Sequence, residues 1–83
     1  MHVYISKADL HRQICRNIRM YRIQAGLTQD KLSEKVDISH DYLRQLESEK
    51  GQKYFSFYTL YKISLVLKVS LDELASGSQI RTT

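Results

Sequence analysis

The chain has 83 residues, a length that accommodates one small domain with one hydrophobic core and no second, ligand-sensing domain. Its formal net charge of +4 favours an anionic partner, and the excess lies in residues 1–35, which carry seven Lys or Arg against three Asp or Glu. The single cysteine excludes an internal disulfide, and no apolar run is long enough for a membrane span or a signal peptide, so we expect a soluble protein of a reducing cytoplasm.

A long first helix is predicted to begin between residues 6 and 9 and to end at Gly26, a residue type that often terminates helices. Its apolar residues recur at spacings of four, four and three, which is typical of one buried helix stripe: Leu10, Ile14, Ile18 and Tyr21. Ser6 and Asp9 have the spacing of a capping box at its start. We expect Cys15 to be a small buried apolar residue on this helix rather than a redox switch.

The same helix carries a basic stripe, whose members recur at spacings of four, three and three: Arg12, Arg16, Arg19 and Arg22. A row of guanidinium groups fits a phosphate backbone, and it fits a merely solvated helix face equally well. For the first three arginines both interpretations stay open.

Residues 28–47 predict two short helices joined by a tight turn at residues 36–38. Each helix begins at a residue that caps helices well and continues with apolar residues three or four apart: Thr28 with Leu32 and Val36, then Ser39 with Leu43 and Leu46. Two helices this short cannot bury their apolar stripes alone, so the remaining segments must close a core around them.

Two more helices are predicted in the C-terminal part of the chain. Ser56 caps one whose apolar residues recur at three and four: Leu60, Ile63 and Leu67. Ser70 and Glu73 form a capping box that starts a last short helix, which is stopped by Gly77 and has one apolar side: Leu71, Leu74 and Ala75.

Several separated motifs occur in order along the chain: Gly26-Leu-Thr-Gln-Asp-Lys-Leu-Ser-Glu-Lys-Val36, Ile38-Ser39, Leu43-x-x-Leu46-Glu47 and Val69-Ser-Leu-Asp-Glu-Leu74. Together they resemble the phage repressor and Cro type of helix-turn-helix protein over roughly residues 10–76. The resemblance implies an all-α fold, a compact bundle of five short helices of the lambda repressor-like kind. Residues 1–83 then form one domain, with a core at about 7–76, an arm at 1–6 and a tail at 77–83.

The resemblance further implies that the third helix, about residues 39–48, enters the major groove of double-stranded DNA. The side chains that match base-contacting positions are His40, Asp41, Arg44 and Gln45. The expected contacts to phosphate are Thr28, Gln29, Ser39, Tyr42, Arg19, Arg22, Lys50 and Lys53. For Gln29 the alternative is an ordinary solvated side chain in the first turn of a helix.

The four base-contacting candidates differ in their chemistry. Gln45 can bond adenine N6 and N7, and Arg44 can bond guanine O6 and N7, each with about 1–3 kcal/mol of discrimination. Asp41 is repelled by phosphates unless it accepts from a cytosine N4 amine or turns back to cap its helix, and both interpretations stay open. His40 can donate to a guanine or a phosphate, and its titration near neutral pH would make binding pH-sensitive.

Three further expectations concern the frame around this helix. In the resembling family, the arginine that matches Arg22 pairs with a glutamate that closes the third helix, here Glu47. Asp37 stands where the family usually has Gly, and Asp tolerates positive φ, so the turn survives at a modest cost. The loop at 48–55 is a few residues longer than the family's common form and leads into an aromatic cluster that serves core closure or a dimer contact: Tyr54, Phe55, Phe57 and Tyr58.

The predicted function is that of a sequence-specific transcription regulator that binds a palindromic operator as a homodimer. The two copies are expected to associate through the C-terminal helix and the loop before the helix that begins at Ser56. The alternative is an antitoxin-like protein-interaction module, which the acidic Asp41 and Glu47 favour. We expect no enzyme, cofactor, metal or small-molecule ligand, because the three histidines are far apart and no metal-ligand spacing occurs. We expect a bacterial or phage-encoded protein at the cytoplasmic nucleoid and no membrane partner.

Overall fold

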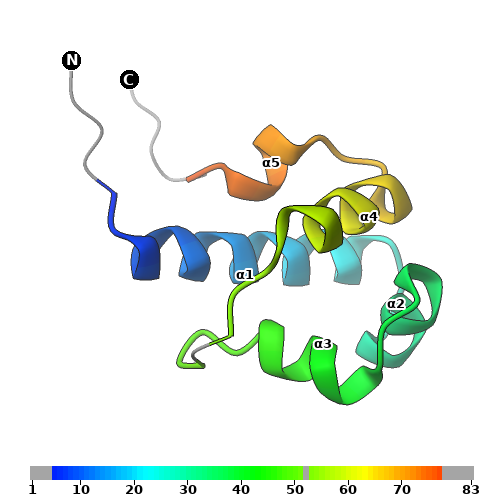
Figure 1. Cartoon of the computed structure of the whole chain (residues 1–83). Helices are drawn as coiled ribbons and strands as arrows, with labels where there is room; N and C mark the ends of the chain where they lie inside the picture. The colour runs from blue at the N-terminus through cyan, green and yellow to red at the C-terminus, as the bar shows by residue number, and fades with distance from the viewer. Residues whose placement is uncertain (1–4, 52, 78–83) are drawn as a thin grey trace.

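The computed structural model describes residues 5–51 and 53–77, and this part of the chain folds into five helices (Figure 1). The helices are α1 (Lys7–Gln24), α2 (Gln29–Val36), α3 (His40–Leu46), α4 (Phe57–Leu67) and α5 (Leu71–Ala75). The predicted all-α class and the order of its helices are confirmed, although α3 is shorter than the predicted 39–48. Most of the predicted arm and tail, residues 1–4 and 78–83, lies outside the described residues. None of the helices just named is both long enough and apolar enough to cross a membrane.

Every helix begins at a hydroxyl side chain that accepts from the backbone N–H three residues further on, at 2.9–3.1 Å: Ser6, Thr28, Ser39, Ser56 and Ser70. Such a cap stabilises a helix by about 1 kcal/mol. The reciprocal bond of a capping box forms only at Ser70, whose backbone N–H donates to Glu73. At Ser6 only the cap of the predicted capping box forms, because the carboxylate of Asp9 pairs with Arg12.

Three residues in the described chain adopt the left-handed conformation, and each follows a helix. Gly26, with φ of 74°, reverses the chain after α1. Asp37, with φ of 60°, ends α2, so the predicted tolerance of Asp in the turn is confirmed. Lys68, with φ of 61°, ends α4 and was not predicted, since Lys has no special preference for positive φ. Helix α5 is followed by the extended Ser76, directly before Gly77, where the sequence predicts that the helix stops.

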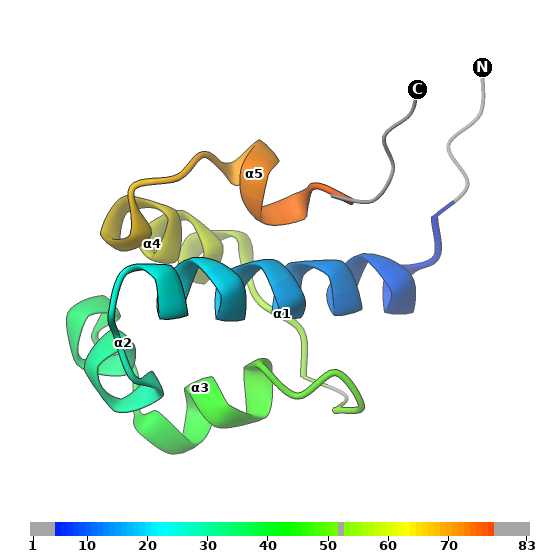
Figure 2. The ribbon, with the colours of Figure 1, turned by 180° about the vertical axis from the view of Figure 1, so that it is seen from behind.

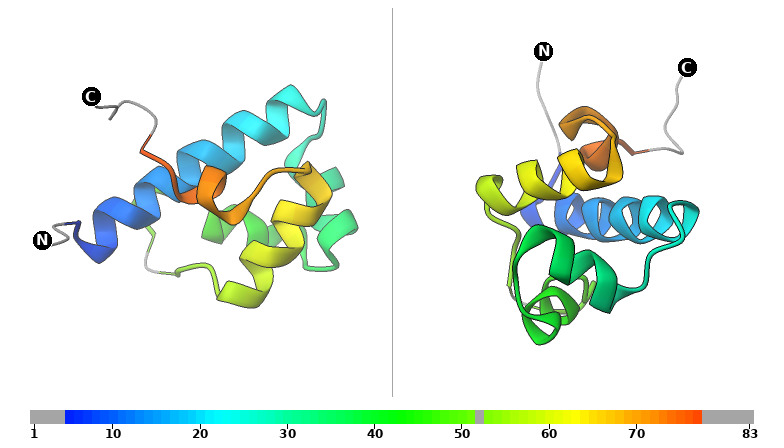
Figure 3. Two further views of the ribbon diagram at one scale, coloured as in Figure 1. Left: turned by 90° about the horizontal axis from the view of Figure 1, so that it is seen from above. Right: turned by 90° about the vertical axis from the view of Figure 1, so that its right-hand side faces the viewer.

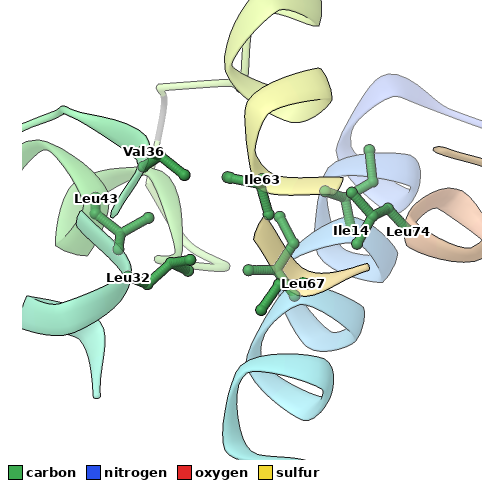
Figure 4. Packing of buried hydrophobic residues seen from close by; sticks show 8 residues of the cluster. Ile14, Leu32, Val36, Leu43, Ile63, Leu67 and Leu74 are labelled. Atoms are coloured by element: carbon green, nitrogen blue, oxygen red, sulfur yellow. The ribbon is translucent and has the colours of Figure 1, made fainter. Parts of the chain in front are cut away.

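The long helix α1 runs through the middle of the molecule, with α2 and α3 on one side and α4 and α5 on the other (Figures 1 and 2). The core draws side chains from all five helices: Ile14, Ile18, Leu32, Val36, Leu43, Ile63, Leu67 and Leu74. Figure 4 shows Leu32 and Val36 of α2 and Leu43 of α3 facing Ile63 and Leu67 of α4. The two short helices therefore bury their apolar stripes against α4 as well as against each other.

The five-residue helix α5 is bound to α1 by side-chain amides. The Nδ2 group of Asn17 donates to the carbonyl oxygens of Leu74 at 2.8 Å and Ser76 at 2.7 Å, and Gln13 Nε2 donates to Ala75 O at 3.1 Å. Carbonyl groups at a helix end lack partners within the helix. Since Asn17 is only 7% exposed, these bonds hold the end of α5 in a buried position on α1.

Candidate nucleic-acid interface

The pair α2 and α3 forms a helix-turn-helix, with residues 37–39 between the two helices. Helix α3 lies at one edge of the molecule, on the side of α1 opposite to α5 (Figure 1). Leu43 and Leu46 anchor it in the core at 0% exposure. Its outward side chains form what we call the reading face: His40, Asp41, Arg44 and Gln45.

Within the reading face, Asp41 binds both Arg44 and Gln45. The carboxylate of Asp41 accepts from Arg44 Nη2 through Oδ1 and from Gln45 Nε2 through Oδ2, the latter at 2.8 Å. Asp41 does not cap α3, because Ser39 already accepts from Tyr42 N at 3.0 Å. The base-reading groups predicted from the sequence are therefore held together by a carboxylate, a relation that the i, i+3 and i+4 spacing could have revealed.

His40, in the first turn of α3, lies near Asp30 in the first turn of α2. Its Nδ1 lies 3.8 Å from Oδ1 of Asp30, and both side chains are about half exposed or more. An imidazolium would be attracted to that carboxylate, although the gain is small between solvated groups. His40 thus stands at the junction between the first turns of the two helices.

Beneath α3, three polar side chains form a partly buried cluster that we call the Glu47 network: Arg22, Gln29 and Glu47. Arg22 Nε lies 3.3 Å from Glu47 Oε2, and the two side chains are 12% and 2% exposed. Gln29 Nε2 donates to Glu47 Oε1 at 2.8 Å, and Arg22 Nη1 donates to Leu27 O at 3.1 Å. The Arg22–Glu47 pair expected from the resemblance is thus present as a contact between α1 and the end of α3.

The Glu47 network includes two side chains that the sequence predicts to contact phosphate, Arg22 and Gln29. The amide nitrogen of Gln29 is bound to Glu47 at 2.8 Å, and Arg22 is mostly buried against Glu47 and Leu27. Both side chains connect their helices to the end of α3 rather than pointing into solvent. The Gln29 contact was missed in the sequence, because nothing in the spacing of residues 29 and 47 indicates that they meet.

The basic stripe of α1 is paired with carboxylates along its length. Arg16 Nη2 and Arg19 Nη1 lie 3.3 Å and 3.4 Å from the two oxygens of Glu49, and Arg12 pairs with Asp9. Partial burial disfavours ionised Glu49, but the hydrogen bonds and charges of Arg16 and Arg19 outweigh it and lower the pKa of this carboxyl. The stripe is therefore neither a bare phosphate-binding row nor a merely solvated face, because two of its arginines bind the segment that follows α3.

That segment also carries the two lysines predicted to meet phosphate. Lys50 and Lys53 are exposed, and the loop encloses with the end of α3 a concavity of about 390 Å³ lined by Arg44, Gln45, Ser48, Gly51 and Lys53. A side chain at Gly51 would place its Cβ 3.2 Å from the carbonyl oxygen of Gln45. The glycine therefore lets the loop lie close against α3, which brings Lys53 beside the reading face.

A second buried cluster holds α1 against the end of α3. Cys15 is fully buried, as predicted, and its Sγ donates to Leu46 O at 3.3 Å, while His11 Nε2 lies 3.3 Å from Ser48 O. Burial, together with the charges of Glu49 and Glu47, raises the pKa of Cys15 to about 11. A thiol with so high a pKa stays protonated and unreactive, so the role of Cys15 is structural.

The ring of Tyr54 stacks on His11 with 4.6 Å between centroids, which fastens the loop before α4 to the same cluster. Phe55 packs against the core, so two of the four predicted aromatic residues serve core closure or loop anchoring. Within the described ranges 5–51 and 53–77, no group of three His, Cys, Asp or Glu side chains could hold a metal ion.

A short helix anchored by apolar residues, exposed along its outer face and braced by a second helix across a tight turn defines the helix-turn-helix class of DNA-binding proteins. The model of the HTH_3 family, described as helix-turn-helix, matches residues 18–74. The chain therefore belongs to this Cro/C1-type helix-turn-helix family of DNA-binding transcription regulators, and the resemblance seen in the sequence is confirmed.

Solved structures with the same fold include transcription regulators. A hypothetical transcription factor, NHTF, from Neisseria aligns with a TM-score of 0.75 at 18% identity, covering 92% of this chain and 86% of that one. Two structures of the clp gene regulator ClgR from Corynebacterium glutamicum align with TM-scores of 0.74 and 0.73 at 28% and 26% identity. They cover 83% and 88% of this chain, and 74% and 96% of theirs. No curated protein sequence matches significantly.

Proposed function

We propose that this protein is a sequence-specific transcription regulator that binds a palindromic operator in double-stranded DNA as a homodimer, with α3 in the major groove. The observation that carries the proposal is the reading face, where Arg44 and Gln45 extend from a helix whose opposite side is locked into the core. Both side chains have natural bidentate targets on base edges, guanine and adenine respectively. Two such helices, related by a two-fold axis and about 34 Å apart, read successive major grooves.

The base contacts come from all four members of the reading face. Arg44 and Gln45 provide direct donors, while Asp41 orients both and can accept from a cytosine N4 amine beside them. His40 donates to a guanine or a phosphate at the start of the helix. The acidic member favours discrimination, because a carboxylate near phosphates is tolerated only where a base donor satisfies it.

The phosphate contacts surround the reading face. Thr28, Ser39 and Tyr42 lie at the starts of α2 and α3, where backbone N–H groups attract anions, and Lys50 and Lys53 lie on the loop beyond α3. Arg19 contributes from α1 with its charge shared with Glu49. Arg22 and Gln29 act mainly through Glu47, by fixing the angle at which α3 meets the groove.

The proposed setting is bacterial or phage-encoded DNA at the cytoplasmic nucleoid, with the chain acting as one domain. The dimer contact expected from the resemblance involves α5 and the loop before α4. Cro/C1-type family membership supports double-stranded DNA as the partner rather than the protein surface that an antitoxin-like module would bind.

The testing experiment is selection of bound duplexes from a random DNA library, followed by titration of the enriched sequence at two salt concentrations. We expect an inverted repeat with half-sites about 10 base pairs apart and an affinity that falls steeply with salt. A matched control is Arg44→Ala, which should lose the enriched motif and remain folded. If no sequence is enriched and binding ignores salt, the proposal fails and the protein-interaction module becomes the better explanation.

A further inference from the structure

Helix α4 leaves an uncovered stripe of large apolar side chains, which we call the α4 face: Phe57, Tyr58, Tyr61 and Leu65. Their exposed fractions are 71%, 68%, 48% and 60%. Phe57, Tyr61 and Leu65 are spaced by four, so they follow one ridge of the helix, and Tyr58 lies beside them. The rings of Phe57 and Tyr61 are nearly parallel with 6.5 Å between centroids, which gives the stripe a continuous aromatic surface.

The α4 face has the size and composition of an interface centre. An aromatic side chain buries about 150–250 Å² when fully covered, so these exposed fractions amount to roughly 450 Å². That is more than half of the roughly 800 Å² that each partner buries in a standard protein–protein interface. Helix α4 contains no Asp or Glu, and its only charge, Lys62, folds over Tyr58 with Nζ 4.7 Å from the ring centroid. Depletion of charge around exposed aromatic residues is typical of interface cores.

The position of α4 fits a second copy of the chain. Seen from the end of the molecule, α4 runs from beside α1 to one side, where its N-terminal end lies, while α3 lies at the bottom (Figure 3, right). We consider a two-fold axis that passes through that side and is perpendicular to the surface that carries α3. Such an axis places the α3 helices of both copies on the same surface of the dimer. A dimer that reads one duplex needs this arrangement.

Helix α5, by contrast, offers little to a partner. Its main apolar residue, Leu74, is 1% exposed, and its terminal carbonyls are bound by Gln13 and Asn17 of α1. The residues that it exposes are Asp72 and Glu73. Across a two-fold axis, like charges would face each other and oppose association.

We infer that the α4 face is the surface through which two copies of this protein associate, with the helices crossing at Tyr61. In such an isologous contact Tyr61 meets the partner's Tyr61, and Phe57 of one copy meets the partner's Leu65. Ridges spaced by four pack at a crossing angle of about 50°. This inference rests on the homodimer of the proposed function and names its interface, moving it from α5 to α4.

The first test measures self-association without DNA, by sedimentation equilibrium of the full chain. Tyr61→Glu should raise the dimer dissociation constant by roughly 30-fold or more, the size of a central interface residue. The matched control is Ile23→Glu, which places the same charge at an apolar residue of α1 that is 63% exposed and outside the α4 face. A monomeric wild type at all accessible concentrations overturns the inference, as does a Tyr61→Glu variant that associates like the control.

The second test remains decisive if the charged variant unfolds. Tyr61→Cys should form a disulfide-linked dimer under mild oxidation, because the two-fold axis brings position 61 next to its copy. Ile23→Cys is the matched control, and the native Cys15 does not interfere because it is 0% exposed. Equal cross-linking at positions 23 and 61, or none at 61, contradicts the proposed crossing point.

DNA binding then separates this inference from the proposed function. If both hold, Tyr61→Glu should keep the base preference of a single half-site and lose the added affinity of the full inverted repeat. Loss of dimerisation with no base preference in either protein supports the α4 face and rejects the operator-binding function. An unchanged affinity of Tyr61→Glu for the full repeat rejects the α4 face and leaves the function standing.

Discussion

Two arginine–carboxylate pairs lie on opposite sides of α3 and serve different purposes. On the outer side, Arg44 and Asp41 are 64% and 62% exposed, whereas on the inner side Arg22 and Glu47 are 12% and 2% exposed. An exposed pair contributes about 0–1 kcal/mol, but breaking a buried pair by removing one partner costs about 3–5 kcal/mol. The difference teaches that burial, not residue type, decides the role of such a pair. An exposed pair can separate to bind a ligand, whereas a buried pair stabilises the fold.

The largest expected effect comes from breaking the inner pair. Glu47→Ala leaves the buried Arg22 guanidinium without its counter-charge and removes the acceptor of Gln29, so we expect a loss of about 3–5 kcal/mol in unfolding free energy. Urea denaturation measures it. The matched control is Glu49→Ala, whose arginine partners are 59% and 42% exposed and which should cost about 1 kcal/mol or less.

A double-mutant cycle sharpens the same point. Because Arg22→Ala and Glu47→Ala each strand a buried charge that the double variant does not contain, the combined loss should be clearly smaller than the sum. Strictly additive losses would mean that the 3.3 Å contact carries no coupling.

On the outer side, replacement should change specificity rather than stability. Gln45→Ala should lose base preference at one position in each half-site, by about 1–3 kcal/mol, while the unfolding free energy stays within roughly 0.5 kcal/mol. Binding to the preferred duplex and to single-base variants measures the change. An equal loss of affinity at every sequence would show that Gln45 touches only the phosphate backbone.

Asp41→Asn should have a smaller effect of the opposite sign. The substitution weakens the contact with Arg44 and removes a negative charge near the phosphates, so affinity should rise by roughly 1 kcal/mol or less for duplexes that lack a cytosine opposite Asp41. The dependence of affinity on salt should become steeper, because an additional phosphate is contacted. At sites with the cytosine whose N4 amine Asp41 accepts from, affinity should fall instead, and a rise at those sites too would remove Asp41 from the base contacts.

The smallest effect concerns pH and the pair between Glu49 and the arginines of α1. Folding lowers the pKa of Glu49. Its contribution to the free energy of unfolding is therefore complete above the pKa of the unfolded state, 4.5, and is lost as the pH falls through the lower pKa of the folded state. Unfolding measured from pH 6 downward should show wild type and Glu49→Gln converging in acid. A difference that stays constant below pH 4.5 would show that Glu49 acts through packing.

Much of the local architecture was predictable from the sequence. The serine and threonine caps, the apolar spacing of each helix and the left-handed Asp37 depend on neighbours three or four residues away, and these interactions were identified correctly. Even here one local prediction is only half confirmed, since Ser6 caps α1 but Asp9 binds Arg12 rather than completing the capping box. Lys68 was missed because lysine has no preference for positive φ that the sequence could reveal.

The candidate site divides in the same way. The reading face follows from helical periodicity together with the family resemblance, and the Arg22–Glu47 contact was expected from the resemblance alone. The sequence did not predict three sets of contacts between distant residues. They are the contacts of Glu47 with Gln29, of Glu49 with Arg16 and Arg19, and of the terminal carbonyl groups of α5 with Gln13 and Asn17. Each joins residues at least 18 positions apart in the chain.

The sequence by itself thus determined the helices, their order and the family, because these properties arise from spacing within one turn or two and from motifs in register. Only the tertiary structure decided which polar groups are occupied and which apolar groups remain uncovered. An arginine that faces water is free to contact a phosphate. An arginine that pairs with a carboxylate from another helix instead connects the two helices. Likewise, Phe57, Tyr61 and Leu65 recur at a spacing of four, and only the packing of the other helices leaves them exposed.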